Sequence, residues 1–357
     1  MRLSEKVNLY GLELPAMEDF FISLGEKKYR AGQCAVRMYR KGALDFSEMT
    51  EFSAKLKTLL SERATLWLPK VIERQESRDG TVKLLLELSD GERVETVLIP
   101  DGERLTQCLS TQVGCAMGCR FCRTATAGLT RNLTPAEIVT QVVAAQLEGG
   151  FGKRVTNIVF MGMGEPLHNF EGTLKSFNIL SSDYGLTIAK RRITVSTCGL
   201  AAKMKELPAE MLPSLALSLN ATTDEVREKI MPVTRAHPIS ELIATLKALP
   251  LPARARYTIE YVLLGGLTAT MEDAARLVRL LSGVPSKINL IPYNPHGESD
   301  FAAPDPEQVE RFKRYLLDKH FVAVTRKSKG DDILAACGQL KAENEERGGC
   351  APNEERD

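Results

Sequence analysis

The most regular feature of the sequence is an alternation of short apolar runs with longer amphipathic stretches, which begins near residue 105. The apolar runs are rich in β-branched residues and short enough for strands, whereas the stretches between them have the length of helices. This alternation predicts an α/β fold with a parallel sheet, in which ligands bind at the carboxyl ends of the strands. The predicted strands are residues 106–112, 155–161, 192–197, 214–220, 257–264 and 287–291.

One helix of this region has clear start and stop signals. The sequence Thr134-Pro135-Ala136-Glu137 is a capping box with proline at the first helical position. Ile138, Val139, Val142, Val143 and Leu147 follow on one face, and Gly149-Gly150 is a typical end.

The first hundred residues have a different pattern. Residues 28–40 and 46–62 are charged with apolar positions at helical intervals, whereas residues 82–88 and 93–99 predict two strands joined by a turn. The sequence therefore divides into four predicted parts. These are a helical accessory domain (1–72), a β-hairpin extension (73–104), the α/β domain (105–340) and a loose polar tail (341–357).

Composition and charge narrow the class of protein. Hydrophobic residues make up 43% and charged residues 26% of the 357 positions, as in ordinary globular proteins. Neither a secretory signal nor an apolar run of membrane-spanning length is present, so no membrane association is expected. The eight cysteines are clustered, which favours reactive thiols in a reducing cytoplasm over a disulfide framework. The net charge of +1 neither indicates nor excludes a nucleic-acid partner.

Three of the cysteines form one short motif. Cys115, Cys119 and Cys122 are spaced for an iron–sulfur cubane that keeps one iron open, whereas a structural zinc site needs four protein ligands. With the aromatic Phe121 before the last cysteine, the motif resembles that of the radical S-adenosylmethionine (SAM) enzymes. A zinc ribbon is the alternative, but no Cys or His pair lies at the spacing needed to complete one.

Short polar side chains follow several predicted strands. At one rim of the sheet they would form a ring able to bind a nucleoside, although each could simply be a polar strand end or a plain turn. They are Glu165, Ser196, Ser218, Asn220 and Asn294, with Leu219 among them. The glycines beside Glu165, Gly162 and Gly164, would let the backbone approach a ligand closely.

Longer motifs link these residues to two further cysteines, Cys108 and Cys337. A lone cysteine is most often a small buried apolar residue. Here, however, the surrounding sequences resemble the RlmN family of radical SAM RNA methyltransferases and its antibiotic-resistance relatives of the Cfr type. The resemblance runs from about residue 85 to 340 and rests on CLSTQVGC (108–115), GLTRNL (128–133), GMGEP (162–166), LALSLNAT (215–222), NLIPYNP (289–295) and GDDILAACGQL (330–340).

The resemblance implies a fold and a role for each residue. The fold would be a partial (β/α)6 radical SAM barrel. Cys115, Cys119 and Cys122 would hold a [4Fe–4S] cluster, whose open iron binds the amino and carboxylate groups of SAM, and the rim residues would contact SAM. Cys337 would accept a methyl group from one SAM. A radical from a second SAM would activate that methyl group for addition to an adenine, and Cys108 would release the product by forming a disulfide. Glu95 aligns with the family's proton acceptor.

The implied activity is methylation of carbon 2 of an adenosine in 23S rRNA and of the adenosine beside the anticodon in tRNA. An electron donor such as flavodoxin would be required. Three alternatives stay open: methylation of carbon 8 of the same rRNA base, a zinc-stabilised RNA-binding protein, and a radical SAM enzyme of another reaction class.

Some positions depart from the family pattern or match no role in it. Asn220 stands where many relatives have His, and Lys329 stands where Arg is common. Cys34 and Cys198 are interpreted as structural and Cys350 as a thiol of the tail; no histidine is assigned to a metal.

Overall fold

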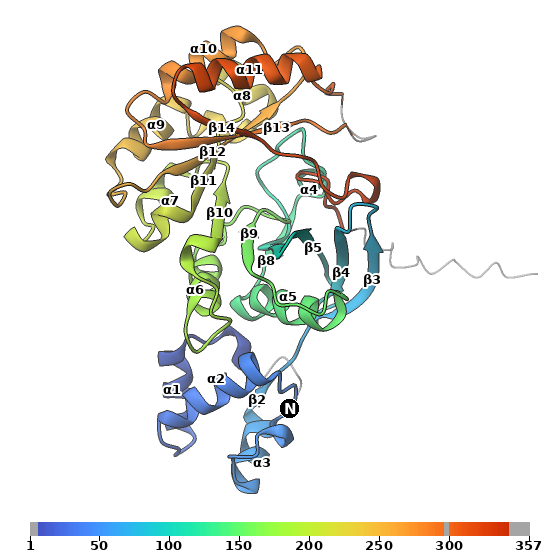
Figure 1. Ribbon diagram of the computed structural model, residues 1–357. Helices are drawn as coiled ribbons and strands as arrows, with labels where there is room; N and C mark the ends of the chain where they lie inside the picture. The colour runs from blue at the N-terminus through green and yellow to red at the C-terminus, as the bar shows by residue number, and fades with distance from the viewer. Residues whose placement is uncertain (1–5, 296–299, 343–357) are drawn as a thin grey trace, which may run out of the picture.

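The parallel sheet predicted from the alternating pattern is present. A computed structural model describes residues 6–295 and 300–342, and its main sheet has ten strands in the order β14-β13-β12-β11-β10-β9-β6-β5-β4-β3 (Figure 1). The seven strands from β6 to β14 pair in parallel. Their bounds are β6 (Arg104–Cys108), β9 (Asn157–Phe160), β10 (Ile193–Thr197), β11 (Leu215–Ser218), β12 (Tyr257–Leu263), β13 (Ser286–Pro292) and β14 (Val322–Thr325).

Helices follow these strands, as expected for a β/α barrel that remains open between its two outer strands. They are α5 (Pro135–Glu148), α6 (Phe170–Ser181), α7 (Ala201–Lys205), α8 (Asp224–Ile230), α9 (Ile239–Ala248), α10 (Met271–Leu280) and α11 (Pro306–Asp318). Every residue of β12 is buried, which places this strand in the centre of the core. The parallel part of the predicted fold is therefore confirmed.

The strand prediction was wrong in three places. The first barrel strand is Arg104–Cys108, and Gln112–Gly114 forms a separate strand, β7, that pairs with β8 (Leu129–Asn132). Strand β14 was not predicted either. It lies at the edge of the sheet, and its alternate residues Val322 and Val324 are exposed. Such short edge strands carry a weak apolar signal.

The predicted β-hairpin is present, but it has a third strand. Strands β4 (Val82–Glu87) and β5 (Arg93–Asp101) pair antiparallel, and β3 (Lys70–Glu76) pairs with the free edge of β4. Five of the seven residues of β3 are charged or Gln, so the strand has little of the alternation that reveals a half-buried strand.

The N-terminal residues form helices, as predicted. They are α1 (Leu14–Ser23), α2 (Tyr29–Lys41) and α3 (Ala54–Arg63), and they lie at the end of the molecule beside α5 and α6 (Figure 1). The predicted helix over 46–62 begins later, because Ser53 caps the backbone N–H of Leu56 at 3.2 Å. Residues Val7–Asn8 pair with Ala64–Thr65 and close this unit.

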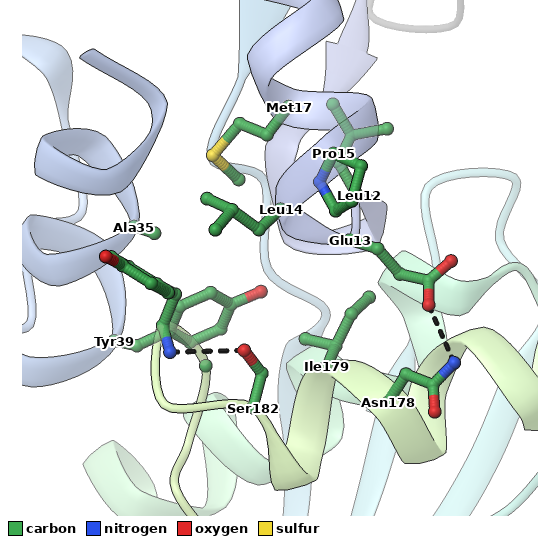
Figure 2. Close-up of a pocket in the computed structure, with 12 residues that line it drawn as sticks. Leu12, Glu13, Leu14, Pro15, Met17, Ala35, Tyr39, Asn178, Ile179 and Ser182 are labelled. Carbon is green, nitrogen blue, oxygen red and sulfur yellow. Dashed lines mark hydrogen bonds between the residues drawn. The ribbon is translucent and has the colours of Figure 1, made fainter. Parts of the chain in front are cut away.

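A cavity of 140 Å³ lies where α1 and α2 meet α6 (Figure 2). Leu14, Met17 and Ile179 line it, and the Asn178 side chain donates to Glu13 at 2.7 Å at its edge. None of the predicted site residues lines this cavity. Among the residues that the structure describes, no helix is long and apolar enough to cross a membrane.

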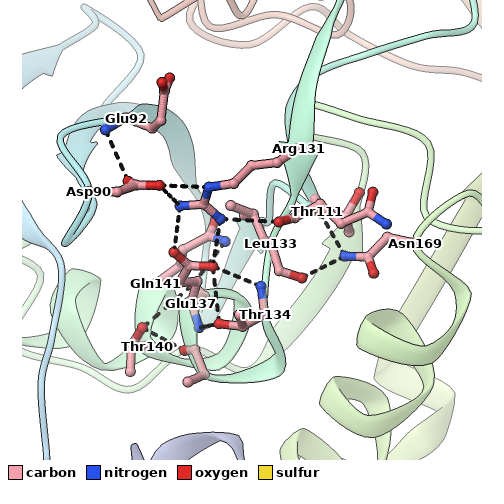
Figure 3. A network of polar contacts seen from close by, with 12 residues as sticks. Asp90, Glu92, Thr111, Arg131, Leu133, Thr134, Glu137, Thr140, Gln141 and Asn169 are labelled. Carbon is pink, nitrogen blue, oxygen red and sulfur yellow. Dashed lines mark hydrogen bonds and ion pairs between the residues drawn. The ribbon is translucent and has the colours of Figure 1, made fainter. Parts of the chain in front are cut away.

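A polar network connects the antiparallel strands to helix α5 (Figure 3). The capping box is confirmed, since Thr134 and Glu137 exchange hydrogen bonds of 2.7 and 3.2 Å. The Arg131 guanidinium binds both oxygens of Glu137 at 2.8 and 3.0 Å and also pairs with Asp90, in the turn between β4 and β5, at 2.7 Å. Of the five apolar residues predicted on one face of α5, only Leu147 is exposed. The network thus fixes the segment that follows the three-cysteine loop.

Candidate active site

The three-cysteine loop lies between β7 and the short helix α4 (Arg123–Thr126). Gly114, at φ +76°, brings the loop so close to the returning chain that a Cβ there would lie 1.9 Å from the Gly128 carbonyl oxygen. The Cys115 amide donates to that oxygen at 2.6 Å. A glycine is therefore required at the start of the loop, and its role is to close the loop base.

The three thiols are partly shielded from solvent. Burial raises the pKa of Cys115 to about 12 and raises that of Cys119 and Cys122. Charge repulsion from Cys122 raises the pKa of Cys115 and Cys119 further. Within the described chain, no group of three or more Cys, His, Asp or Glu side chains converges as a preformed metal site. The donor set nevertheless fits a [4Fe–4S] cluster, because three thiolates leave one iron for another ligand.

The GMGEP turn packs directly on the segment that leads to this loop. A Cβ on Gly162 would lie 2.7 Å from the Leu109 carbonyl, and one on Gly164, at φ +103°, would lie 2.6 Å from the Gln112 side chain. We expected these glycines to let a ligand approach the backbone. In the structure, the positions that a Cβ would take at both glycines are filled by the protein itself, so packing of the turn also requires glycine there.

Glu165 is buried at the end of β9, and both of its carboxylate oxygens accept backbone hydrogen bonds. The Leu167 amide donates at 3.0 Å and the Cys198 amide at 2.8 Å. Burial raises the pKa of this carboxyl, whereas the two amides lower it. The carboxylate is thus held in place by the ends of two neighbouring strands, and its charge raises the pKa of Cys115 and Cys119 nearby.

Substitution of Gly164 by alanine should destabilise the protein by about 3 kcal/mol, because the added methyl group collides with Gln112 and the backbone conformation is strained. Chemical denaturation measures this loss. Gly152→Ala is the matched control, since Gly152 also has positive φ (+61°) but no atom within 4 Å of an added Cβ. Equal losses in the two variants would show that packing of the turn is not the cause.

The next three strands bring the predicted rim residues together. The Ser196 and Ser218 hydroxyls lie 3.3 Å apart at the ends of β10 and β11, and both contact a carboxylate oxygen of Glu260 on β12, at 2.9 and 3.4 Å. Sequence reasoning missed Glu260. A charged residue inside the apolar run YTIEYVL is the signal that could have revealed it.

The chain after Ser218 is held by buried groups. The Leu219 amide donates to the Glu260 carbonyl at 3.0 Å, and the Asn220 side chain accepts from the Val262 amide at 3.0 Å. Asn220 has φ +60°, a conformation that Asn and His adopt more readily than most residues, which explains why either residue suits this position. The fully buried guanidinium of Arg227 donates to the carbonyls of Leu219 and Cys198. Asn294 lies two residues beyond β13 and is half-buried.

The two outlying cysteines lie close enough to each other to interact electrostatically. Cys108 ends β6, is buried, and has a pKa that burial raises to about 12; the negative charge of Cys337 raises it and Arg326 lowers it. Cys337 is exposed, in the segment after β14 that runs back past α4 (Figure 1). The Arg123 amide donates to the Gly338 carbonyl at 2.7 Å, and a Cβ on Gly338 would lie 3.4 Å from the Phe121 carbonyl oxygen. Cys337 is therefore held beside the three-cysteine loop.

The predicted base, Glu95, contacts the same C-terminal segment that carries Cys337. Its side chain is buried between Lys83, whose ammonium group is 3.0 Å from one oxygen, and the Lys341 amide, which donates to the other at 2.8 Å. Only 5% of Glu95 is exposed, so its carboxylate is shielded from solvent. Lys83, like Glu260, is a buried charged residue that sequence reasoning missed.

The remaining described cysteines, Cys34 and Cys198, have no predicted catalytic role. Cys34 is buried in the N-terminal helices against Met38 and Met49, as expected for a structural residue. Cys198 is also buried, but it adjoins the site because its backbone amide donates a hydrogen bond to the Glu165 carboxylate. Cys350 and the polar tail from residue 343 onwards lie outside the described residues.

Comparison with known proteins identifies the family of this chain. Residues 7–66 match the family described as the ribosomal RNA large subunit methyltransferase N-terminal domain, and residues 109–281 match the radical SAM superfamily. The chain is 50% identical to the dual-specificity RNA methyltransferase RlmN of Geobacter sulfurreducens, over 94% of this chain and 92% of that one. This chain belongs to the RlmN family. The RlmN of Geotalea uraniireducens is 48% identical, over 94% of this chain and 97% of its own.

A solved structure extends the RlmN comparison to the fold. A radical SAM methyltransferase from Sphaerobacter thermophilus is 40% identical and superimposes with a TM-score of 0.87, over 94% of this chain and 100% of that one. The fold of this RlmN family member is therefore that of a radical SAM methyltransferase.

Proposed function

We propose that this protein is a radical SAM methyltransferase that adds a methyl group to carbon 2 of adenosine, in 23S rRNA and in tRNA beside the anticodon. The observation that carries the proposal is the convergence of four separate segments, which contain Cys108, Glu95, Cys122 and Cys337, at the rim of a radical SAM barrel. The names of the relatives favour a dual-specificity RNA methyltransferase over the carbon-8 alternative.

The cofactors are a [4Fe–4S] cluster, held by Cys115, Cys119 and Cys122, and SAM. Bound together, they supply radical chemistry that amino-acid side chains lack. Gly164, Glu165, Ser196, Ser218, Leu219, Asn220 and Asn294 would bind SAM. Of these, the Ser196 and Ser218 hydroxyls and the fixed Glu165 carboxylate offer polar atoms at one rim of the sheet. A one-electron donor of the flavodoxin type would complete the system in a cytoplasmic setting.

The protein's own residues carry the methyl group. An aromatic carbon offers no nucleophile for ordinary methyl transfer, so Cys337 would accept the methyl group as a thiolate and carry it to the base. Once that methyl group has lost a hydrogen atom to the SAM-derived radical, its carbon would bond to the base, and Glu95 would take a proton from the adduct. Cys108 would then attack the sulfur of Cys337, forming a disulfide and freeing the methylated base. The exposed position of Cys337 suits a group that must meet both SAM and RNA.

The N-terminal helices would dock the RNA. Lys27, Lys28 and Lys41 are exposed at the two ends of α2, whereas its apolar face is buried. Phosphate contacts of this kind position an RNA without reading its sequence.

Nucleoside analysis of ribosomal and transfer RNA tests the proposal. RNA from a strain without this gene should lack 2-methyladenosine at both sites, and the wild-type gene should restore it. Mass spectrometry against synthetic 2-methyl and 8-methyl standards separates the two products, so restoration of the 8-methyl nucleoside would contradict the carbon-2 assignment. A colourless protein that contains zinc after anaerobic purification would contradict the radical mechanism.

A further inference from the structure

The proposed reaction gives no role to Lys83, a buried charged residue of β4. Its neighbours in the strand, Val82 and Leu84, are fully buried, and only 10% of its own side chain is exposed. Lysine is rarely buried without a partner, because an isolated ammonium group loses its hydration when it leaves water. The presence of Lys83 in an apolar strand therefore calls for a compensating negative charge.

Glu95 provides that charge. Its Oε1 lies 3.0 Å from Lys83 Nζ, and both side chains are buried, so water and salt screen the pair less than they would at the surface. Its Oε2 accepts a hydrogen bond from the Lys341 amide at 2.8 Å. The two carboxylate oxygens thus have donors on two different segments, β4 and the chain after Cys337. These donors together hold the carboxylate in one orientation.

The strand register places this ion pair on the face of the sheet that carries Cys108. Val97 pairs with Lys83 on one side and with Cys108 on the other, and side chains of directly paired residues lie on the same face. Glu95 is two residues from Val97 along β5 and therefore faces the same way. Lys83, the predicted base and the predicted resolving cysteine thus share one face of β4, β5 and β6.

We propose that Lys83 is a positioning residue for the proton-transfer step, in which its ammonium group keeps Glu95 ionised and oriented while the adduct loses its proton. This inference rests on the proposed function, in which Glu95 is the proton acceptor. A carboxyl group can accept a proton only while it is ionised, and burial without a paired cation favours the neutral form. The proton that leaves the adduct binds a Glu95 oxygen, and Lys83 keeps its own proton throughout.

The test follows the reaction of Lys83→Met, whose side chain is unbranched and uncharged, at two points. The first is the gain of a methyl group on Cys337 in the absence of RNA, measured by protein mass, which does not use Glu95. The second is the formation of 2-methyladenosine and of the covalent protein–RNA adduct when RNA is present. Lys83→Met should gain the methyl group as wild type does, form 2-methyladenosine about 10²-fold more slowly, and accumulate the adduct.

A double-mutant cycle separates this role from a structural one. Lys83→Met should cause no further loss of rate in a Glu95→Gln background, because the carboxylate on which Lys83 acts is already absent. Lys83→Arg keeps the charge and should recover most of the loss. Lys83→Gln removes the charge but keeps a hydrogen-bond donor, and it gives the same comparison if Lys83→Met does not fold. Melting temperature and iron content show which variants are folded and hold the cluster.

Lys229→Met is the matched control for loss of a lysine ion pair. Lys229 forms a pair of the same length, 3.0 Å, with Glu225, but both side chains are exposed. An exposed pair contributes little to stability, and this one has no part in the proposed reaction. The variant should therefore match wild type at both points of the reaction.

The outcomes distinguish this inference from the proposed function. Formation of 2-methyladenosine by Lys83→Met at the wild-type rate would overturn the inference. A further loss of equal size in the Glu95→Gln background would also overturn it, because Lys83 would then act on the fold and not through the base. Loss of methyl gain on Cys337 in Lys83→Met would have the same meaning. If wild type neither gains a methyl group on Cys337 nor forms 2-methyladenosine, the proposed function is itself wrong.

Discussion

Cys337→Ala is expected to lose methylation of RNA by at least about 10³-fold while keeping its iron content, because the variant lacks the thiolate that accepts the methyl group. Cys337 is exposed, and its neighbour Gly338 contacts the cysteine loop through backbone atoms that the substitution leaves unchanged. The loss should therefore come from chemistry and not from folding. Incubation with isotopically labelled SAM and RNA, followed by mass spectrometry of the nucleosides, measures it.

The mass of the protein provides a second measurement for the same variant. Wild type incubated with SAM should gain one methyl group on Cys337, and Cys337→Ala should gain none. Cys34→Ala is the matched control, because Cys34 is buried against Met38 and Met49 in the N-terminal helices and should not affect methyl transfer. Turnover by Cys337→Ala would instead support a radical SAM enzyme that works without a carrier thiol.

Cys108→Ala is expected to stall with the protein covalently attached to RNA. Methyl transfer to Cys337 and addition to the base do not need Cys108, whereas release requires a second thiol to attack the Cys337 sulfur. Burial raises the pKa of Cys108 to about 12 and Arg326 lowers it, so a base and this nearby cation would both favour the reactive thiolate. A ribonuclease-sensitive band of reduced mobility on a denaturing gel should accumulate, with methylated RNA reduced at least about 10²-fold.

The double variant Cys108→Ala/Cys337→Ala is the control for that adduct. It should form no covalent complex, because the carbon that links protein to RNA is carried on Cys337. An adduct in the double variant would place the link on another residue. Rapid product release by Cys108→Ala without an adduct would show that Cys108 does not resolve the intermediate.

Much of the architecture could be predicted from local patterns. The capping box at Thr134 and the apolar runs of the barrel strands depend on neighbouring residues, so the helix start and five strand positions agree closely with the structure. Strand β3 could not be predicted in this way, since its charged residues form a strand only because β4 offers an unpaired edge. Its existence is a consequence of tertiary pairing.

The candidate site also combines features that the local sequence determines with features that depend on the tertiary structure. By itself, the sequence determined the donor set Cys115, Cys119 and Cys122, because ligand type and spacing are local properties of the chain. Only the tertiary structure decided that Cys337 lies beside Cys122 and that Glu95 meets the Lys341 amide, since residues so far apart in the chain meet only through the strand order of the sheet. The ion pair between Lys83 and Glu95 likewise depends on the register in which β4 pairs with β5.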